Sequence, residues 1–508
     1  MDKTLDYQNG KYRALYKSLN AQWRALCADY LPVSPENSIW RFSREANPDD
    51  PEQGWKLHIP ATVLTANQVL EKIAPCLRRR NVLFKAPASL QELDKINCGI
   101  YYGYAQVGKF ITIYPQRVEE AAALARRLHQ LTLGIAAPAV PYDLRFKPES
   151  RVYYRYGSFK LLKLESSESS DTTYAIRDPA GNLVPDVRDS ETAKPDWVSD
   201  LFPTARPQRK VKAVETPLKT TFRVFRALSQ RGKGGVYQAL DLTARPRLCI
   251  LKEGRSEGEV DWIGRDGYWR IKHEESVLSA LRAAGINVPH VYSSFEAGKN
   301  YYLAIEFIEG VPLEKYLSRK KRRLAIARAL ALGIQLSALM ARIHDAGWVW
   351  RDCKPHNLLL AEQGELRPLD FEGACPVNQP DAMPWGTNSY RPPEWDQDFR
   401  GQTRLPEDLY ALGAVIYLLL TGRLPDAAAQ QPIEASRPDV PPSVRELVME
   451  LLDAKPERRP SAHEAAERLQ QAAASLKHRS RGKQSRSQGR QSLRHEGNGE
   501  KPFQVIAV

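Results

Sequence analysis

Few cysteines occur in this chain, and they are scattered. None belongs to a Cys-x-x-Cys pair or to a cluster with histidine; the six are Cys27, Cys76, Cys98, Cys249, Cys353 and Cys375. This spacing argues against a disulfide framework and against a structural zinc site. We therefore expect reduced thiols with structural roles.

Long apolar runs, a targeting segment and internal repeats are also missing. The longest apolar run, 411–420, is far shorter than the roughly 20 residues that span a bilayer. The first residues show no basic stretch followed by an apolar one. No similarity recurs at a period of about 20 to 50 residues, which argues against a solenoid. The sequence therefore predicts a soluble cytoplasmic protein with no membrane partner.

The composition is that of an ordinary globular protein of large size. The chain has 508 residues, of which 42% are hydrophobic and 26% are charged. These proportions exclude a chain that is disordered throughout. At roughly 150 residues per domain, the length suggests about three units.

Positive charge is concentrated near the end of the chain. Lys and Arg number 74 against 60 Asp and Glu, a net charge of +14. Between 477 and 501, eight basic and two acidic residues (8 − 2) contribute +6 in a tract rich in Ser, Gln and Gly. Such a tract suits nucleic acid, an acidic peptide or solvent alone. We predict a basic disordered tail over 476–508 and no nucleic-acid partner.

Composition divides the rest of the chain into two folded domains. A basic stretch bounded by prolines, 203–217, predicts a linker. Before it, β-branched and aromatic residues predict a helix at 116–133 among strands at 82–85, 109–114 and 152–156. These patterns predict an α+β domain over 1–202.

After the linker, strand patterns precede helical ones. The strand-like stretches are 222–253 and 301–307, and the helical ones are 321–346, 407–421, 443–453 and 461–476. A small sheet-rich lobe followed by a helical lobe fits this order, and we assign 218–475 to this domain. The fold class predicted for the whole chain is α+β multidomain.

Three strings in the helical lobe carry the strongest local signal. They are WRDCKPHN at 350–357, LDFE at 369–372 and GTNSYRPPE at 386–394. With these strings, the segment 218–475 resembles the protein kinase superfamily. Transfer of a γ-phosphoryl group needs a base for the acceptor hydroxyl, divalent ions against the phosphate charge and a cation on the nucleotide.

The resemblance implies a role for individual residues and two cofactors, ATP and Mg²⁺. Asp352 is the base and Lys354 steadies the transferred phosphate, while Asn357 and Asp370 hold Mg²⁺. The ATP site is expected to comprise Lys252, its ion-pair partner Glu274, Gly232, Gly234, Val236, Glu306 and Ile308.

The chain departs from the kinase pattern at several positions. The residues that match the three loop glycines are Ser229, Arg231 and Gly234, so only the last glycine is kept. Trp350 replaces the usual His, and Glu372 replaces the usual Gly after Asp-Phe. Because neither change removes a metal ligand or the base, we expect an active enzyme. A pseudokinase scaffold is the alternative.

The expected activation segment contains no early phosphorylation site. Between Asp370 and Thr387 there is no Ser, Thr or Tyr, so Arg351 lacks a phosphorylated partner there. We therefore predict activity without phosphorylation of this segment. Asp408 and Arg459 match structural anchors of the large lobe.

The N-terminal domain carries its own set of cationic residues. Lys56 and His58 are two residues apart, so they lie on one face if the segment is extended. No acidic metal cage accompanies the others, which with one tyrosine are Lys85, Lys109, Tyr114, Arg145 and Arg155. A cationic pocket for phosphate is one interpretation, and separate solvated side chains are the other.

Longer strings in this domain carry a second resemblance. They are GWKLH at 54–58, GKFITIYP at 108–115 and IRDPAGNLVPDVR at 176–188. In front of a kinase-like domain, these strings resemble the class III and IV lanthipeptide synthetases. The N-terminal lyase of that family is similar to the phosphothreonine lyases of bacterial effectors. The likeness covers residues 1–475.

This second resemblance implies a β-elimination site. Lys85 is the base, which must be neutral, and burial beside other cations would lower its pKa in that direction. His58 protonates the departing phosphate, and Lys56 stabilises the enolate. The residues that grip the phosphate are Arg145, Arg155, Lys109 and Tyr114.

Together the two resemblances imply a peptide dehydratase. The kinase phosphorylates Ser or Thr of a leader-bearing precursor peptide, and the lyase leaves dehydroalanine or dehydrobutyrine. Full-length relatives carry a cyclase after the kinase, and we expect none here, so rings would require a separate cyclase. The alternative is a regulatory Ser/Thr kinase whose N-terminal domain binds phosphopeptides.

Overall fold

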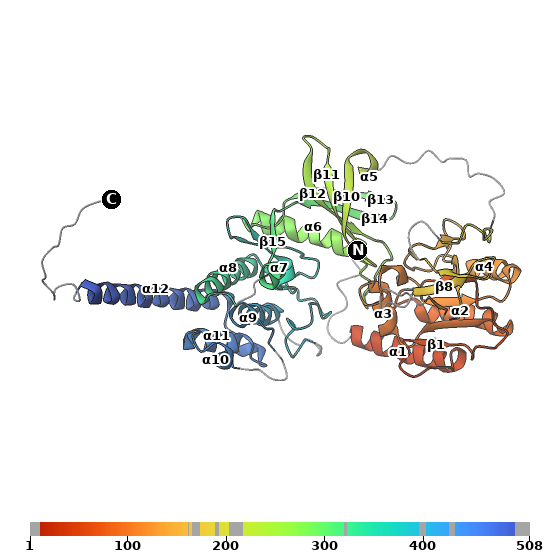
Figure 1. Ribbon diagram of the computed structural model, residues 1–508, viewed down its shortest axis with the longest axis horizontal. Coiled ribbons are helices and arrows are strands. Elements are labelled where there is room, and N and C mark those ends of the chain that lie inside the picture. Colours follow the sequence, from red (N-terminus) through yellow and green to blue (C-terminus); the bar gives the residue numbers. More distant parts are fainter. Residues whose placement is uncertain are drawn as a thin grey trace, which may run out of the picture. The chain divides into compact units, whose positions relative to one another are not determined.

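The computed structural model divides into two compact units, the first comprising Met1–Ser279 and Pro289–Phe307 and the second Ala280–Val288 and Ile308–Val508 (Figure 1). The structure describes residues 11–160, 162–164, 173–187, 193–202, 217–319, 323–395, 403–425 and 432–492. All but the last residue of the predicted linker, 203–217, lies outside these ranges. This division differs from the predicted border at the linker. The strands of the predicted small lobe belong to the same unit as the N-terminal domain.

A six-stranded sheet forms the centre of the N-terminal domain. Its strands run in the order β1-β3-β4-β2-β6-β5, and each neighbouring pair is antiparallel. In chain order they are β1 Trp40–Phe42, β2 Gln53–Ile59, β3 Leu83–Pro87, β4 Ile111–Tyr114, β5 Leu144–Arg145 and β6 Tyr153–Ser158. The three strands predicted for this domain are thus present, displaced by one or two residues at their ends.

The two faces of this sheet differ in polarity because side chains alternate along each strand. One face places Leu57, Phe84 and Ile113 in the hydrophobic core, where they are fully buried. Helices α2 (Ala66–Arg79) and α4 (Val118–Thr132) contribute to the same core. The other face carries polar side chains, namely Lys56, His58, Lys85 and Thr112.

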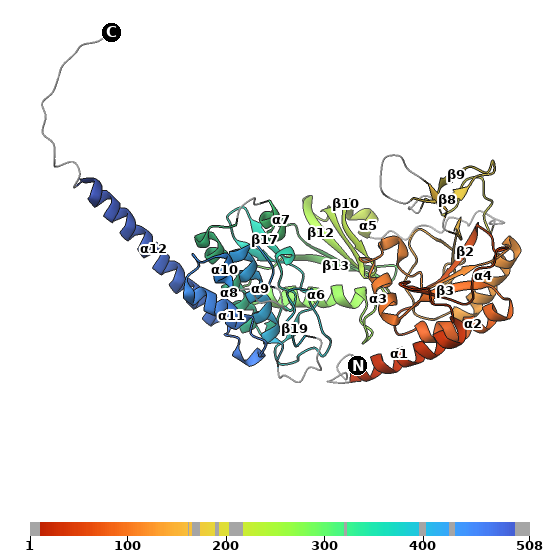
Figure 2. The ribbon, with the colours of Figure 1, turned by 60° about the horizontal axis from the view of Figure 1, so that its bottom comes forward.

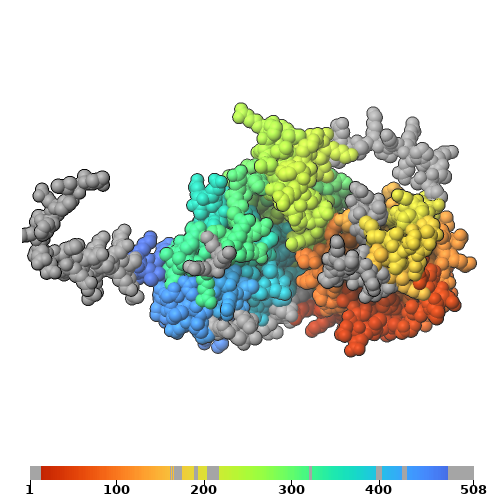
Figure 3. Space-filling view, viewed as in Figure 1, coloured from red at the N-terminus to blue at the C-terminus, as the bar shows by residue number. Residues whose placement is uncertain are grey.

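The remaining elements of the N-terminal domain surround this sheet. Helix α1 (Lys11–Tyr30) packs along α2 (Figure 2). Helix α3 (Leu90–Cys98) begins at Ser89, whose hydroxyl accepts a hydrogen bond from the Glu92 amide. A single 3₁₀ turn follows at Tyr104–Gln106. A small sheet of β7 Lys163–Leu164, β8 Thr173–Arg177 and β9 Leu183–Pro185 contacts β6 through β8. Figure 3 shows this part of the chain as a yellow region on the surface.

The rest of the first unit is a five-stranded antiparallel sheet with one long helix. The strand order is β10-β11-β12-β14-β13, and helix α6 spans Gly267–Ala283. In chain order the strands are β10 Phe222–Arg231, β11 Gly234–Asp241, β12 Arg247–Gly254, β13 Val291–Ala297 and β14 Asn300–Glu306, after a short helix α5 at Pro217–Thr220. This is the small sheet-rich lobe that the sequence predicts.

The second unit is mainly helical. Its helices are α7 Leu313–Ser318, α8 Ile326–Asp345, α9 Leu405–Thr421, α10 Ile433–Ser436, α11 Pro442–Leu451 and α12 Ala462–Ser492. Short strands and 3₁₀ turns lie between them, at β15 Gly310–Pro312, β16 Trp348–Val349, Pro355–Asn357, β17 Leu358–Ala361, β18 Leu366–Pro368, β19 Cys375–Pro376 and Pro456–Arg458. Each predicted helical stretch of this lobe has a counterpart, so the mixed helix and strand class is confirmed.

Helix α8 is long and apolar enough to cross a membrane by length and composition alone. Half of its apolar window is buried within the protein, and it packs against α9 and α12. These contacts are those of a core helix, because the apolar face is covered by other helices of the same unit.

Helix α12 continues beyond the predicted stretch 461–476. It ends at Ser492, so the first part of the segment expected to be a disordered tail is helical, and 493–508 lie outside the described residues. Arg, Lys and Gln are good helix formers, and no proline interrupts the segment, so helix can propagate from the packed first turns.

Candidate functional site

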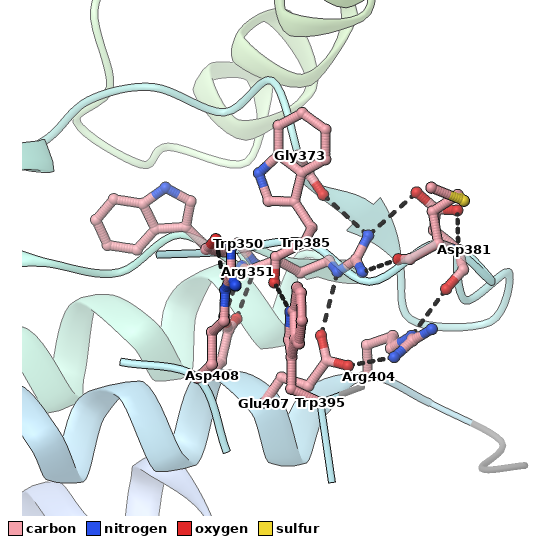
Figure 4. A network of polar contacts seen from close by, with 12 residues as sticks. Trp350, Arg351, Gly373, Asp381, Trp385, Trp395, Arg404, Glu407 and Asp408 are labelled. Carbon is pink, nitrogen blue, oxygen red and sulfur yellow. Dashed lines mark hydrogen bonds and ion pairs between the residues drawn. The ribbon is translucent and has the colours of Figure 1, made fainter. Parts of the chain in front are cut away.

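The loop that follows β16 in the second unit is held by a single buried carboxylate. Asp408 of α9 accepts hydrogen bonds from the Trp350 amide at 2.7 Å and the Arg351 amide at 2.6 Å. Arg351 adopts a left-handed φ of 68°, which is uncommon outside glycine. Because α9 is buried along almost its whole length, the loop is anchored to the core of the lobe (Figure 4). This is the anchoring role that the sequence predicts for Asp408.

The predicted base lies at the centre of a polar cluster. Asp352 accepts hydrogen bonds from Lys354 Nζ at 2.7 Å, Asn357 Nδ2 at 2.9 Å and Thr387 Oγ1 at 2.9 Å. Lys354 also donates to Thr387 Oγ1 at 2.7 Å. Burial raises the pKa of Asp352, and Lys354 opposes this shift. The structure thus brings together three predicted residues and adds Thr387, which the sequence marked only as the first hydroxyl of its segment.

The predicted metal ligands carry suitable donor atoms. The Asn357 amide nitrogen is a donor to Asp352, so its amide oxygen is the atom that would bind a cation. Asp370, with a left-handed φ of 64°, supplies a carboxylate in the same unit. Oxygen ligands of this kind fit Mg²⁺, which would neutralise phosphate charge during transfer.

Trp350, which stands where protein kinases usually have a histidine, donates a hydrogen bond from its side chain. Its indole Nε1 donates to the Asp370 carbonyl at 3.0 Å, and its ring stacks on Phe371 with centroids 5.3 Å apart. The indole therefore links the two strings that contain the predicted base and a predicted metal ligand. The departure from the kinase pattern is accommodated because tryptophan also offers a ring N–H donor.

We expect Trp350→Phe to lower kcat for peptide phosphorylation about fivefold to tenfold. The variant keeps the stacked ring but removes the indole N–H that donates to the Asp370 carbonyl, and a hydrogen bond of this kind contributes about 0.5 to 1.5 kcal/mol. A radiometric assay with saturating ATP measures the effect. Trp348→Phe, two residues away on β16, is the matched control and should retain the wild-type rate; equal rates for both variants would contradict the assigned bond.

The first unit carries the predicted nucleotide-binding pair. Lys252 Nζ of β12 lies 2.7 and 2.6 Å from the two carboxylate oxygens of Glu274 on α6. Glu274 is 1% exposed, and Val236 lies opposite Lys252 in the sheet. The predicted ion pair is therefore present, and the cation is held beside the β10–β11 turn.

The remaining predicted ATP residues occupy the turn and the end of β14. A Cβ at Gly234 would lie 1.7 Å from the Glu253 carbonyl oxygen, so close packing on β12 requires glycine there. Gly232 lies in the same turn. Glu306 is the last residue of β14; its amide donates to the His290 carbonyl, and its side-chain carboxylate accepts a hydrogen bond from the His290 amide. Ile308 is half-buried just beyond it.

A second constellation lies on the polar face of the N-terminal sheet. Thr112 of β4 is in register with Lys85 of β3 on one side and with His58 of β2 on the other. Lys56 pairs with Arg155 of β6 in the next row. Cross-strand partners project from the same face, so the predicted base and the predicted acid do not face apart.

A cavity of about 380 Å³ opens on this face. Of the predicted residues, Lys56, Lys85 and Tyr114 line it. Lys85 Nζ lies 4.1 Å from the centre of the Trp40 ring. Lining residues that the sequence analysis did not single out include Trp40, Tyr102, Lys160 and Tyr174. The cavity therefore combines three lysines with aromatic walls.

His58 is paired with an aspartate that the sequence analysis overlooked. His58 Nδ1 lies 2.5 Å from Asp143 Oδ2, and both side chains are almost fully buried. Lys109 Nζ lies 3.7 Å from the other oxygen of Asp143. Burial lowers the pKa of His58 to about 4, although Asp143 acts in the opposite direction. The available signal was an acidic residue two positions before Arg145, one of the cationic residues that the sequence analysis singled out.

The predicted phosphate-binding residues are not all at the cavity. Arg155 is buried in an ion pair with Asp186 at 2.9 Å and also donates to the Val187 carbonyl. Arg145 is exposed on the edge strand β5 and donates to the Pro148 carbonyl at 2.7 Å. Among the described residues, neither arginine lines the cavity. Tyr114 lines it, and Lys109 is directed to Asp143.

Comparison with known families matches both domains. Residues 30–214 match the model for the RamC N-terminal domain, and residues 227–469 match the model for the protein kinase domain. These ranges contain the cationic sheet face and the clusters around Lys252 and Asp352, respectively.

Individual relatives agree with this assignment. A probable SapB synthase of Streptomyces coelicolor is 30% identical over 355 residues, which are 68% of this chain and 38% of the relative. The serine/threonine-protein kinases PknA of Mycobacterium tuberculosis (46% of this chain, 57% of the relative) and pkn2 of Myxococcus xanthus (50% and 33%) are each 31% identical. The chain thus spans between about one third and 57% of the length of these relatives. It joins a RamC N-terminal domain to a protein kinase domain and fits the class III/IV lanthionine synthetase-like proteins.

Proposed function

We propose that the chain dehydrates Ser and Thr residues of a leader-bearing precursor peptide in two steps. The kinase domain transfers the γ-phosphoryl group of ATP to the side-chain hydroxyl with Mg²⁺ bound, and the N-terminal domain then eliminates phosphate. The proposed products are dehydroalanine and dehydrobutyrine, formed in the cytoplasm, with any rings made by a separate cyclase. The observation that carries the second step is the cationic cavity bordered by Lys85 on the face that also carries His58.

The first step follows from the cluster around Asp352. Its carboxylate is the acceptor for the hydroxyl proton of the substrate, and Lys354 lies beside it to steady the transferred phosphoryl group. Bound Mg²⁺ would neutralise phosphate charge, held by Asn357 and Asp370. Lys252, fixed by Glu274, is the cation for the nucleotide phosphates.

The second step is a β-elimination in which one C–H bond and one C–O bond break. Lys85 takes the α-proton, the C–H electron pair forms the Cα=Cβ double bond, and the phosphate oxygen leaves with the Cβ–O pair. Lys56 stabilises the negative charge that develops on the substrate carbonyl oxygen. The leaving oxygen receives its proton from His58.

The pKa of His58 has to rise for this role. In the structure, burial holds it near 4, so the imidazole is neutral at neutral pH. A phosphate dianion bound close to the ring favours the charged imidazolium, in addition to Asp143. The acid is therefore formed when the phosphorylated substrate binds.

Asp143→Asn tests this electrostatic argument. Without its carboxylate the imidazolium loses a favourable partner, so the pKa of His58 falls in the substrate complex. Since the acid form is lost as pH rises through that pKa, the elimination rate should decline at lower pH than in the wild type. Phosphate release from a synthetic phosphopeptide, measured against pH, records the shift. Asp29→Asn, on the exposed side of α1, should leave the profile in place; an unshifted profile in Asp143→Asn would exclude the proposed role of His58.

The decisive experiment for the whole proposal is mass spectrometry of a candidate peptide after incubation with enzyme, ATP and Mg²⁺. A product lighter by one water for each modified residue supports dehydration. A stable phosphopeptide that remains tightly bound to the protein would favour the alternative, a regulatory kinase with a phosphopeptide-binding domain.

A further inference from the structure

Arg351 precedes the base, and its guanidinium is completely buried in the second unit. A buried charge is costly unless it is paired and hydrogen-bonded. Here Nε lies 3.2 Å from Glu407 and Nη1 lies 3.1 Å from Asp381. Carbonyls of Gly373 and Met383 accept the other hydrogen bonds. Two carboxylates and two carbonyls of this chain therefore hold the guanidinium (Figure 4).

Asp381 lies in the segment between Asp370, a predicted metal ligand, and Thr387, which contacts Asp352. Its Oδ1 accepts a hydrogen bond from the Met383 amide at 3.0 Å, which closes a local turn. Its backbone carbonyl accepts from Arg404 Nε at 2.8 Å, and the Ala382 carbonyl accepts from Arg404 Nη2 at 2.9 Å. Arg404 also pairs with Glu407. Two arginines and two carboxylates thus fasten the middle of this segment to the start of α9.

The end of the segment is tied to its beginning. A Cβ at Gly373 would lie 1.9 Å from the Trp385 indole nitrogen, so the two positions are in close contact. The Trp385 carbonyl accepts from Trp395 Nε1 at 2.6 Å. Two residues further, Thr387 reaches Asp352 and Lys354. An unbroken series of contacts therefore leads from Asp381 to the base.

We propose that Asp381 is a positioning residue for phosphoryl transfer, because its carboxylate takes the place of a phosphorylated side chain on Arg351. The segment has no hydroxyl residue between Asp370 and Thr387, so Arg351 needs an anion that is present as soon as the chain folds. The aspartate supplies that charge without a prior modification. The segment of the second unit that contains Asp381 is accordingly held in place as soon as this unit folds.

Neutralising Asp381 tests the proposal directly. Asp381→Asn is expected to lower kcat for peptide phosphorylation by about tenfold to a hundredfold, since misplacing catalytic groups has effects of this size. The KM for ATP should stay within about twofold, because Lys252 and Glu274 are not involved. Hydrogen exchange at 373–387 should become faster. Asp439→Asn, which breaks an Asp–Arg pair elsewhere in the same unit, is the matched control and should change none of these.

Two further arms keep the test decisive. If Asp381→Asn melts early, the Asp381→Glu and Asp381→Gln variants are compared, since they have equal length and differ only in charge; the glutamate variant should retain severalfold more activity. Wild-type enzyme treated with a phosphatase should keep its peptide kinase activity. Equal activity of the Glu and Gln variants, or loss of activity after phosphatase treatment, would overturn the proposal. Neither arm depends on the elimination step.

Discussion

Substituting Lys85 by methionine is expected to stop the reaction at the phosphopeptide. Methionine has nearly the same length but cannot accept a proton, and a positioned base contributes about 10²- to 10⁴-fold to such a step. Peptide, ATP and Mg²⁺ incubated with the variant should give a product heavier by one phosphoryl group per site. Intact mass spectrometry distinguishes this product from the dehydrated peptide, which is lighter by one water.

The effect of Lys85→Met must be compared with that of a lysine outside the cavity. Lys95→Met is the matched control, because Lys95 lies on α3, pairs with Glu92 and does not line the cavity. This variant should dehydrate the peptide as the wild type does. His58→Ala should also accumulate phosphopeptide, because the leaving oxygen then lacks its acid. Clean dehydration by both Lys85→Met and His58→Ala would refute the elimination mechanism.

Asp352→Asn is expected to abolish phosphorylation while leaving elimination intact. The asparagine keeps the size and most hydrogen bonds of the side chain but accepts no proton, so phosphoryl transfer should fall about 10²- to 10⁴-fold. Phosphate release from a synthetic phosphopeptide should continue at the wild-type rate. The two assays therefore assign each step to its own domain.

A conservative control and a mixing experiment complete this test. Asp345→Asn, at the exposed end of α8, should phosphorylate normally. Mixing the two single-variant proteins, Asp352→Asn and Lys85→Met, in one reaction should restore dehydration, because each protein supplies the step that the other lacks. If Asp352→Asn phosphorylates the peptide at the wild-type rate, this carboxylate is not the base. If Asp352→Asn loses phosphoryl transfer while the wild type and Asp345→Asn keep it, the protein is not a pseudokinase.

Much of the kinase site could be predicted from spacing. Asp352, Lys354 and Asn357 are neighbours in one loop, so their proximity follows from the sequence itself. The ion pair of Lys252 with Glu274 was predicted as well, because the resemblance to protein kinases implies a strand lysine paired with a helical glutamate. The contact of Thr387 with Asp352 depends on a long segment folding back, and no local pattern indicates such a contact.

In the N-terminal domain, the sequence predicted the candidate site residues but not all of the side chains with which they pair. Alternation along β2 was enough to place Lys56 and His58 on one face. His58 pairs with Asp143, which immediately precedes β5. Arg155 of the main sheet pairs with Asp186, which immediately follows β9 of the small sheet. Such pairings depend on the tertiary fold, because several segments that meet in space, such as β2 and β6, are far apart along the chain.

By itself, the sequence determined the two-domain composition, the strands and helices of each lobe, and the candidate residues of both sites. These features depend on local periodicity and on motifs whose residues are close along the chain. Only the tertiary structure decided which charges are satisfied internally, among them Arg351 by Asp381 and Arg155 by Asp186. The physical reason is that a buried charge is stabilised by whichever group the fold brings within a few ångströms, and that distance is set by packing rather than by position in the chain.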